Sequence, residues 1–137
     1  MPDEIVLDAS VAAKMFITEQ GSDEARALAL SGLRMIAPEL ILIELTNVAV
    51  KRMRSGDIGR GMAQEMVAAA AELLHELVSA RHLIARAFVL AADHGFSTYD
   101  ATYVALAELR ACDLVTSDLR LASAARRAKL PIILRQP

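Results

Sequence analysis

Short β-branched runs alternate with longer helical segments along the chain, and this alternation restricts the fold more than any other sequence feature. Strands are predicted at residues 4–8, 34–38, 77–80, 112–118 and 131–134. Because neighbouring parallel strands need a crossover connection, usually a helix, the pattern predicts a mostly parallel sheet of about five strands with helices on both faces. The expected fold class is α/β, with three layers in the order α/β/α.

Helical periodicity fills the intervals between these strands. Apolar spacing and end signals predict helices at 11–18, 22–30, 39–54, 58–77, 81–94, from Ser97 or Thr98 onward, and 119–129. No internal repeat or linker interrupts the 137 residues, which is a common size for one domain. We therefore expect a single domain over residues 1–137.

Composition excludes several classes of protein. With 55% hydrophobic residues, 23% charged residues and four prolines, the chain is too apolar to be disordered. No run reaches the roughly 18 apolar residues that span a bilayer, and "MPDEIVLDAS" at the N-terminus lacks a signal-peptide pattern. The expected location is the cytoplasm.

Cysteine and histidine offer little chemistry in this sequence. Cys112 is the only cysteine, so no internal disulfide forms, and its apolar surroundings predict a buried, inert thiol. The three histidines, His75, His82 and His94, lack the H-x3-5-H spacing of zinc sites. We therefore expect neither a disulfide framework nor a zinc centre.

The charge balance limits how the chain could bind nucleic acid. A net charge of −2 and a pI near 5.9 argue against a broad cationic surface, so such a partner must be bound locally. Basic residues gather at 51–54 and 126–129, each near the end of a predicted helix. The helix dipole accounts for both groups at least as well as phosphate contact does.

Four acidic residues interrupt apolar segments. Asp8 ends the first predicted strand, and Asp118 lies just past the strand segment "DLVTS". In a parallel sheet, ligands bind at the carboxyl edge of the strands, near a change in strand order. Glu44 in "ELILIELTNVAV" shares a helix face with Asn47, and Asp100 begins an otherwise apolar helix. An acid in the first turn of a helix is also favoured by the helix dipole alone, so that alternative stays open for Asp100.

Four like charges that meet in a fold repel one another unless cations lie between them. Hard oxygen ligands of this kind favour Mg²⁺ or Mn²⁺. The pattern of acids therefore indicates a divalent-metal site.

Four strings, in this order, carry a family resemblance: "IVLDAS", "ELTNV", "YDATYVALAE" and "LVTSD". They resemble, in turn, the first acid followed by a serine, the helical Glu with Asn three residues on, the third acid and the Thr-x-Asp ending of PIN-domain ribonucleases. Within that family the chain looks most like the VapC toxins of bacterial and archaeal toxin–antitoxin pairs, over essentially its whole length. The resemblance implies that four acids bind metal: Asp8, Glu44, Asp100 and Asp118. It also implies that three polar residues support them: Ser10, Asn47 and Thr116.

The resemblance also implies a reaction, the endonucleolytic hydrolysis of RNA by a water activated on Mg²⁺. Asp8 and Asp100 are then expected to ligate the metal directly. Glu44 would orient or deprotonate the water, and Asp118 would complete a second metal site or act through bound water. The family pattern departs at Ser117, where relatives often carry a charged or amide side chain, so a substrate contact there is in doubt.

Partners follow from the same resemblance. Family members are usually neutralised by a small antitoxin whose C-terminal segment enters the acidic groove, often with an arginine. A homodimer is expected, and with antitoxin a heterotetramer or larger assembly. The apolar stretches "LILIELTNVAVKRM" and "MAQEMVAAAAELL" are candidate surfaces.

Simpler roles remain possible for the supporting residues. Ser10 is also placed to cap a helix, Asn47 could satisfy a backbone group, and Thr116 could be an ordinary strand residue. Four further acids lie beside glycines or element ends and are left out of the site: Asp23, Asp57, Asp93 and Asp113.

Two other classes of function are weighed against the nuclease. A phospho-accepting receiver domain needs paired acids near the first strand and a lysine after the last, and "IVLDAS" and "PIILRQP" supply neither. A catalytically weak PIN-like module that acts mainly in its antitoxin complex remains an alternative.

Overall fold

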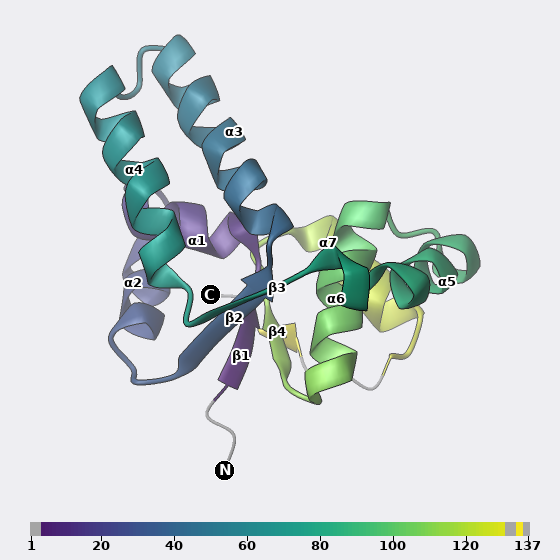
Figure 1. The fold of residues 1–137 in the computed structure, drawn as a ribbon. Coiled ribbons are helices and arrows are strands. Elements are labelled where there is room, and N and C mark those ends of the chain that lie inside the picture. The colour runs from purple at the N-terminus through teal and green to yellow at the C-terminus, as the bar shows by residue number, and fades with distance from the viewer. Residues whose placement is uncertain (1–3, 131–133, 136–137) are drawn as a thin grey trace.

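A five-stranded parallel sheet forms the centre of the computed structural model, which describes residues 4–130, 134 and 135 (Figure 1). The strands lie in the order β3-β2-β1-β4-β5, and all four pairings are parallel. Their bounds are β1 (Glu4–Leu7), β2 (Arg34–Pro38), β3 (Glu76–Val78), β4 (Asp113–Val115) and β5 (Leu134–Arg135). The predicted α/β class is confirmed. Of the predicted strand 131–134, residues 131–133 lie outside the described part of the chain.

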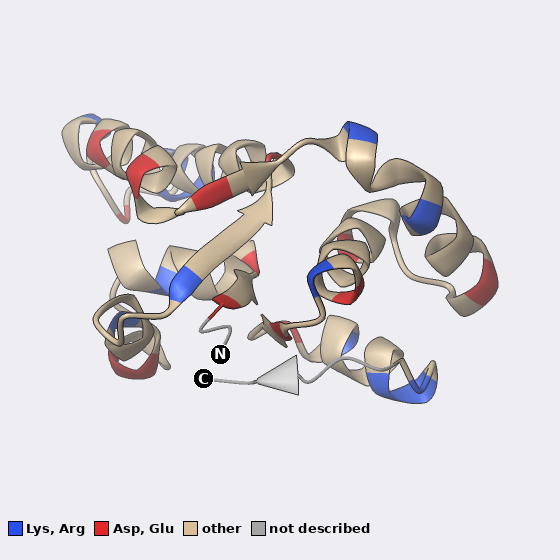
Figure 2. Cartoon of the chain, turned by 60° about the horizontal axis from the view of Figure 1, so that its bottom comes forward, with Lys and Arg blue, Asp and Glu red and all other residues tan. Residues whose placement is uncertain are grey.

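Helices cover both faces of this sheet, as Figures 1 and 2 show. One layer contains α1 (Ala9–Phe16), α2 (Ser22–Ala29), α3 (Leu40–Arg54) and α4 (Arg60–Leu73). The other contains α5 (Ile84–His94), which follows the short 3₁₀ helix η1 (Ala80–His82), then α6 (Thr98–Arg110) and α7 (Leu119–Arg127). The three-layer arrangement predicted from the alternation is therefore present.

The strand order reverses between β1 and β4. From β1 the chain moves outward through β2 to β3, then returns to form β4 on the other side of β1. The register places Ile5 of β1 opposite both Met35 and Asp113. The carboxyl ends of β1 and β4 therefore adjoin at the switch point, where open α/β sheets bind ligands.

Helix α6 is the most deeply buried helix of the described chain. Every residue from 101 to 107 is buried, and the helix packs against β1, β2, β4 and α5. Three alanines in this segment keep its surface small, which allows close approach to neighbours on several sides. Such packing fixes the start of α6 relative to the sheet edge.

The predicted helix 58–77 is wrong at its C-terminal end. Helix α4 ends at Leu73, and the following residues join the edge of the sheet. The His75 backbone N–H donates to the Met35 carbonyl (2.8 Å), and His75 Nδ1 accepts from the Met35 N–H (2.9 Å). These two bonds draw the chain into β3 at 76–78, one residue earlier than the predicted strand at 77–80.

Cys112 is half-buried rather than fully buried, and burial raises the pKa of its thiol. A protonated thiol is a poor nucleophile, in agreement with the inert cysteine predicted. Among the described residues, no helix has the length and apolar character needed to cross a membrane.

Candidate functional site

Asp8 lies at the switch point, directly after β1. Its backbone N–H continues the ladder to the Val115 carbonyl (3.0 Å), and only 6% of the residue is exposed. Its Oδ2 accepts hydrogen bonds from Ser10 Oγ and Thr116 Oγ1, each at 2.7 Å. Burial raises the pKa of this carboxyl, and the charge of Asp118 adds to the increase. Two neutral hydroxyls, rather than a cation, therefore hold the carboxylate in place.

The two hydroxyls beside Asp8 are themselves oriented by backbone donors. Ser10 Oγ accepts from the Ser117 N–H (2.9 Å), and Thr116 Oγ1 accepts from the Asp118 N–H (3.0 Å). Each hydroxyl has one proton, which is donated to Asp8. In α1, Asp8 occupies the N-cap position and Ser10 lies in the first turn. The prediction that Ser10 caps this helix is therefore wrong. The reason is that its hydroxyl is used between β1 and β4 instead of at the helix end.

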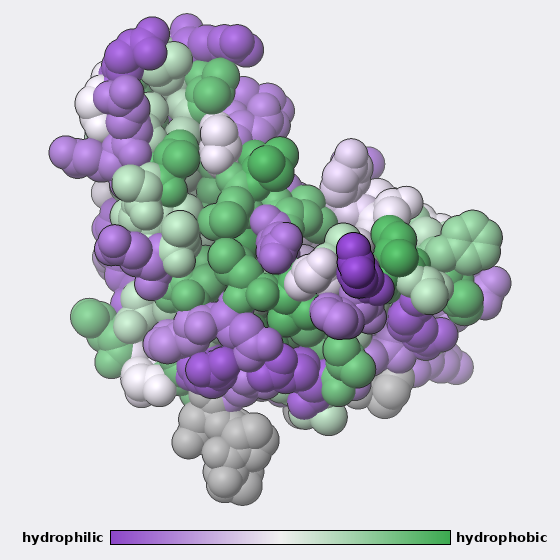
Figure 3. All heavy atoms as spheres, in the orientation of Figure 1, coloured by the Kyte–Doolittle hydropathy of each residue, from purple (hydrophilic) through white to green (hydrophobic). Residues whose placement is uncertain are grey.

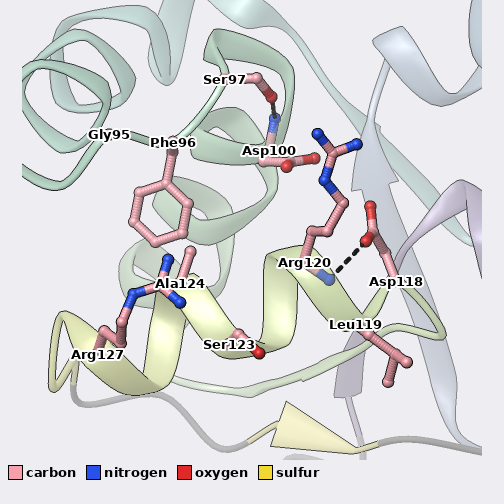
Figure 4. Close-up of a pocket in the computed structure, with 10 residues that line it drawn as sticks. All are labelled: Gly95, Phe96, Ser97, Asp100, Asp118, Leu119, Arg120, Ser123, Ala124 and Arg127. Atoms are coloured by element: carbon pink, nitrogen blue, oxygen red, sulfur yellow. Dashed lines mark hydrogen bonds between the residues drawn. The ribbon is translucent and has the colours of Figure 1, made fainter.

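Asp118 combines a structural and an electrostatic role. It is the N-cap of α7, and its Oδ1 accepts from the backbone N–H groups of Arg120 (2.9 Å) and Leu121 (3.3 Å). An acid is well suited to this position because it satisfies free N–H groups and opposes the helix dipole. The cap fixes the carboxylate beside Asp100 (Figure 4).

Asp100 lies in the first turn of α6. Ser97 caps this helix, and its Oγ accepts from the Asp100 N–H (3.1 Å). Burial raises the pKa of the Asp100 carboxyl to about 6, with further contributions from the charges of Asp118 and Asp8. Arg120 lowers that pKa slightly without forming an ion pair, and Figure 4 shows its side chain between the two carboxylates. A first-turn acid stabilised only by the dipole would not be expected to have a raised pKa.

Glu44 approaches the same region from the opposite helix layer. Tyr103 of α6, itself 1% exposed, donates its hydroxyl to Glu44 Oε1 at 2.6 Å. Burial raises the pKa of Glu44 to about 7, and the charges of Asp8 and Asp100 raise it further, against the lowering by Tyr103. The pKa of the Tyr103 hydroxyl is also raised, so it remains a donor.

The structure thus brings together the four acids predicted from the sequence. Of the three predicted supporting residues, Asn47 makes no hydrogen bond to them. Asp8, Glu44, Asp100 and Asp118 come from four separate segments and influence one another electrostatically. Ser10 and Thr116 contact Asp8 directly. Asn47 is exposed on α3 and has no side-chain hydrogen bond to a described residue. It satisfies no backbone group of a described residue, contrary to the alternative considered for it.

The Ser117 side chain makes no hydrogen bond to a described residue. Its Oγ is buried without a hydrogen-bond partner among the described residues, while its backbone N–H binds Ser10. The departure from the family pattern at this position therefore removes a side chain that could reach a substrate.

A model of the PIN domain family matches residues 5–127, which includes all four acids. The chain belongs to the PIN-domain family. It is 32% identical over 121 residues to Ribonuclease VapC3 of Pyrobaculum aerophilum, covering 87% of this chain and 92% of that protein. The chain is accordingly a ribonuclease of the VapC type, as the sequence motifs predicted.

Solved structures share this PIN fold at lower identity. VapC20 of Mycobacterium tuberculosis, described as a sarcin-ricin loop cleaving toxin, is 19% identical with a TM-score of 0.67, over 88% of this chain and 94% of that one. VapBC2 of Rickettsia felis, solved bound to a DNA fragment from their promoter, is 11% identical with a TM-score of 0.68, over 98% of each chain. Both likenesses concern the fold.

PIN-domain ribonucleases generally depend on a metal ion, and carboxylate oxygens such as those of the four acids are ligands for hard cations. None of the four forms an ion pair with a lysine or arginine in the described part of the chain. Among these residues no three His, Cys, Asp or Glu side chains are grouped closely enough to make a ready metal centre. A cation between them would therefore retain several waters, as Mg²⁺ commonly does.

A pocket of about 810 Å³ opens beside Asp100 and Asp118 (Figure 4). Four residues of this region were not predicted as functional from the sequence: Ser97, Tyr103, Arg120 and Arg127. Tyr103 shares a helix face with Asp100, which is visible in the sequence, but its partner Glu44 lies 59 residues away. Only the fold shows that contact.

Proposed function

We propose that this chain is a Mg²⁺-dependent endoribonuclease and the toxin of a type II toxin–antitoxin system, acting as a single PIN domain in the cytoplasm. The observation that carries the proposal is the convergence of four acids on the switch point of the sheet with no ion-pair partner in the described chain. Such an arrangement costs stability in the free protein, and binding of a cation offsets the cost.

Asp8 and Asp100 would hold the ion, with Mn²⁺ as a possible substitute for Mg²⁺. When bound, the metal lowers the pKa of its water and neutralises charge that develops on the phosphate. Ser10 and Thr116 keep the Asp8 carboxylate in one orientation through their 2.7 Å hydrogen bonds. Asp118 lies beside Asp100 at one end of the pocket and would act through a bound water or at a second metal position.

Glu44 is proposed to orient or deprotonate the attacking water. It lies on α3, in the helix layer opposite α6, and the Tyr103 hydroxyl fixes one of its oxygens at 2.6 Å. The other carboxylate oxygen has no hydrogen bond to a described residue and so could accept one from water. Asn47 would support Glu44 only after a change of its side-chain position, because it is exposed in this structure.

The proposed partners are an RNA substrate and a cognate antitoxin, with a homodimer that becomes a heterotetramer or larger assembly on antitoxin binding. A VapBC2 complex with promoter DNA shares this fold. The α3–α4 hairpin, which contains the two apolar stretches noted above, exposes Ile43, Met62 and Val67. Figure 3 shows a hydrophobic area from the inner side of this hairpin toward the centre of the same face.

Cleavage of an RNA pool by the purified chain tests the activity. We expect cleavage of a mixture of tRNA and rRNA in millimolar Mg²⁺, loss of cleavage in EDTA, and no cleavage by an Asp8→Asn variant prepared in parallel. Equal cleavage by the parent and Asp8→Asn would indicate a contaminating nuclease and reject the assignment. Absence of cleavage, together with tight binding of an antitoxin encoded beside this gene, would favour the alternative of a PIN-like binding module.

A further inference from the structure

Two elements form the walls of the pocket beside the acids, and they differ in charge. One wall is the turn that leads into α6, where Gly95 ends α5 with φ of 75° and is followed by Phe96 and Ser97. The other wall is α7 from Leu119 to Arg127. Asp100 and Asp118 lie at one end of the pocket, while Arg127 lies at the other (Figure 4).

Helix α7 presents a line of polar groups to this pocket. Ser123 and Arg127 lie three and seven residues after Arg120, so the three side chains share one helix face. All three are exposed, and neither arginine forms an ion pair with a residue that the structure describes. The seven residues from Arg120 to Arg127 correspond to about 10 Å along the helix axis. A phosphate bound at Arg127 is therefore distinct from a phosphate bound beside the acids.

We propose that this pocket binds a phosphodiester group of the RNA strand next to the one that is cleaved, with Arg127 as its main ligand. The inference rests on the proposed ribonuclease function, because the acids define where the cleaved phosphate lies. Arg120, whose side chain lies between the two carboxylates, then contacts the strand beside the cleaved phosphate. The strand runs along α7, from the carboxylates toward the C-terminal end of that helix.

The chemistry of the walls favours backbone contact over base recognition. A guanidinium presents several donors in a planar fork that matches phosphate oxygens, and Ser123 adds a hydroxyl donor. Phe96 is only 6% exposed, so its ring provides an apolar floor and has no free face on which a base could stack. Contacts to phosphate position a strand without reading its sequence. This pocket therefore contributes affinity that is the same for different RNA sequences.

Binding of labelled single-stranded RNA tests the inference without cleavage. The measurement uses fluorescence anisotropy in millimolar Mg²⁺ with the Asp8→Asn chain, in which the RNA stays intact. Adding Arg127→Gln should raise Kd about tenfold, equally for two unrelated sequences, since one charged hydrogen-bonding contact is lost. The slope of log affinity against log salt should become shallower by about 0.7, the value for one phosphate on a single strand. Arg127→Lys should recover part of the affinity and the whole salt slope.

Arg54→Gln is the matched control. Arg54 occupies the last turn of α3 as Arg127 occupies that of α7, so both substitutions remove the same helix-dipole interaction. Arg54 does not line the pocket, and we expect its substitution to leave Kd within twofold. Equal effects of the two substitutions, or an unchanged salt slope in Arg127→Gln, would overturn the pocket assignment.

Kinetics of the cleaving parent separate this inference from the proposed function. Arg127→Gln should raise KM and leave kcat within about twofold, because its contact is equal in the ground and transition states. A fall in kcat without a change in KM would overturn the positioning role. If the parent does not cleave RNA but Arg127→Gln still weakens binding with the expected salt slope, the pocket stands as a phosphate site and the nuclease proposal fails.

Discussion

Acidic residues at the two ends of the parallel sheet have opposite electrostatic surroundings. At the carboxyl end, four carboxylates have no ion-pair partner in the described chain, and Arg120 lies near two of them. At the amino end, two glutamates and two arginines form a closed network: Glu4, Arg34, Glu76 and Arg110. Acids are neutralised where they hold strands together and are left without counterions where a ligand can supply the charge.

The amino-end network joins three adjacent strands to α6. Arg110 donates to Glu4 Oε2 (2.8 Å) and to Glu76 Oε2 (2.9 Å), and Arg34 donates to Glu76 Oε1 (2.7 Å). Glu4 and Arg34 are also direct partners in the β1–β2 register. Figure 2 views the molecule with this end turned forward. The ion pairs thus close the edge of the sheet at which no ligand is expected.

The pKa values express the difference between the two ends. Hydrogen bonds from Arg110 and Arg34 lower the pKa of Glu76 to about 2. Burial and neighbouring carboxylates raise the pKa of Glu44 to about 7 and that of Asp100 to about 6. Glu76 therefore stabilises the fold when charged, whereas charging Glu44 or Asp100 destabilises the metal-free fold.

Helix α6 connects the two ends. Asp100 lies in its first turn and Arg110 in its last, and each charge has the sign that the helix dipole favours at its position. The helix is also the most buried of the described chain, so it holds both charged groups at fixed positions. Substitutions on one helix can therefore test both ends of the sheet.

Removing one charge at each end should give the largest contrast in activity. We expect Asp100→Asn to reduce RNA cleavage by about a hundredfold or more, since loss of even an outer partner of a metal ligand commonly costs 10- to 100-fold. Glu76→Gln should leave cleavage within about twofold at a temperature where both variants are folded. Initial rates in saturating Mg²⁺ provide the comparison, and equal rates for the two variants would remove the functional distinction between the ends.

Arg110→Gln should give the largest loss of stability. The substitution leaves Glu4, whose side chain is 13% exposed, with a single arginine partner, and several charge-assisted hydrogen bonds are lost. We expect the free energy of unfolding to fall by about 2 kcal/mol. Arg34→Gln should cost less, because Arg34 is 49% exposed. Urea denaturation measures both, and a larger loss in Arg34→Gln would contradict the network as described.

Thr116→Val should affect the carboxyl end alone. The isosteric change removes the hydroxyl that donates to Asp8 and accepts from the Asp118 N–H, and we expect cleavage to fall about tenfold. Thr102→Val is the control, since Thr102 is also buried but donates within α6 to the Thr98 carbonyl. A comparable fall in both variants would mean that Thr116 acts only through packing.

The stability of the metal-free protein should depend on pH in opposite ways at the two ends. Carboxyls with raised folded pKa values destabilise the fold as pH climbs from about 4 through 6 to 7. Glu76, with its lowered pKa, contributes stability that is lost as pH falls from about 4.5 to 2. Thermal melts in EDTA should therefore show maximal stability near pH 4 to 5. Stability that continues to rise up to pH 7 would be inconsistent with the raised pKa values.

The sequence predicted the fold class and the four acids because both depend on local signals. Strands with short apolar runs place Asp8 and Asp118 at strand ends, and helical spacing places Glu44 and Asp100 on apolar faces. Such signals are read from neighbouring residues and need no knowledge of long-range contacts.

Other features of the site depend on contacts between distant segments. The Thr116 hydroxyl reaches Asp8 across 108 residues, and the Tyr103 hydroxyl reaches Glu44 across 59. Ser10 was predicted as a helix cap because its local context is typical of one, and only the β1–β4 pairing shows why it points elsewhere. In the sequence, the basic residues at 126–129 fit a helix-dipole interpretation, and only the fold places Arg127 beside a pocket.

Thermal melts of the parent and Asp100→Asn, with and without Mg²⁺, test the central claim most directly. In EDTA at pH 7 the substitution removes a repelled charge, so we expect the melting temperature to rise by about 3 °C, or about 1 kcal/mol after solvent screening. Mg²⁺ should then stabilise the parent more than the variant, because the variant has lost a ligand. Asp23→Asn, which removes a first-turn acid from α2, should show no increase in EDTA. If Asp100→Asn instead melts lower than the parent in EDTA, and the parent is insensitive to Mg²⁺, the four acids do not form a metal site.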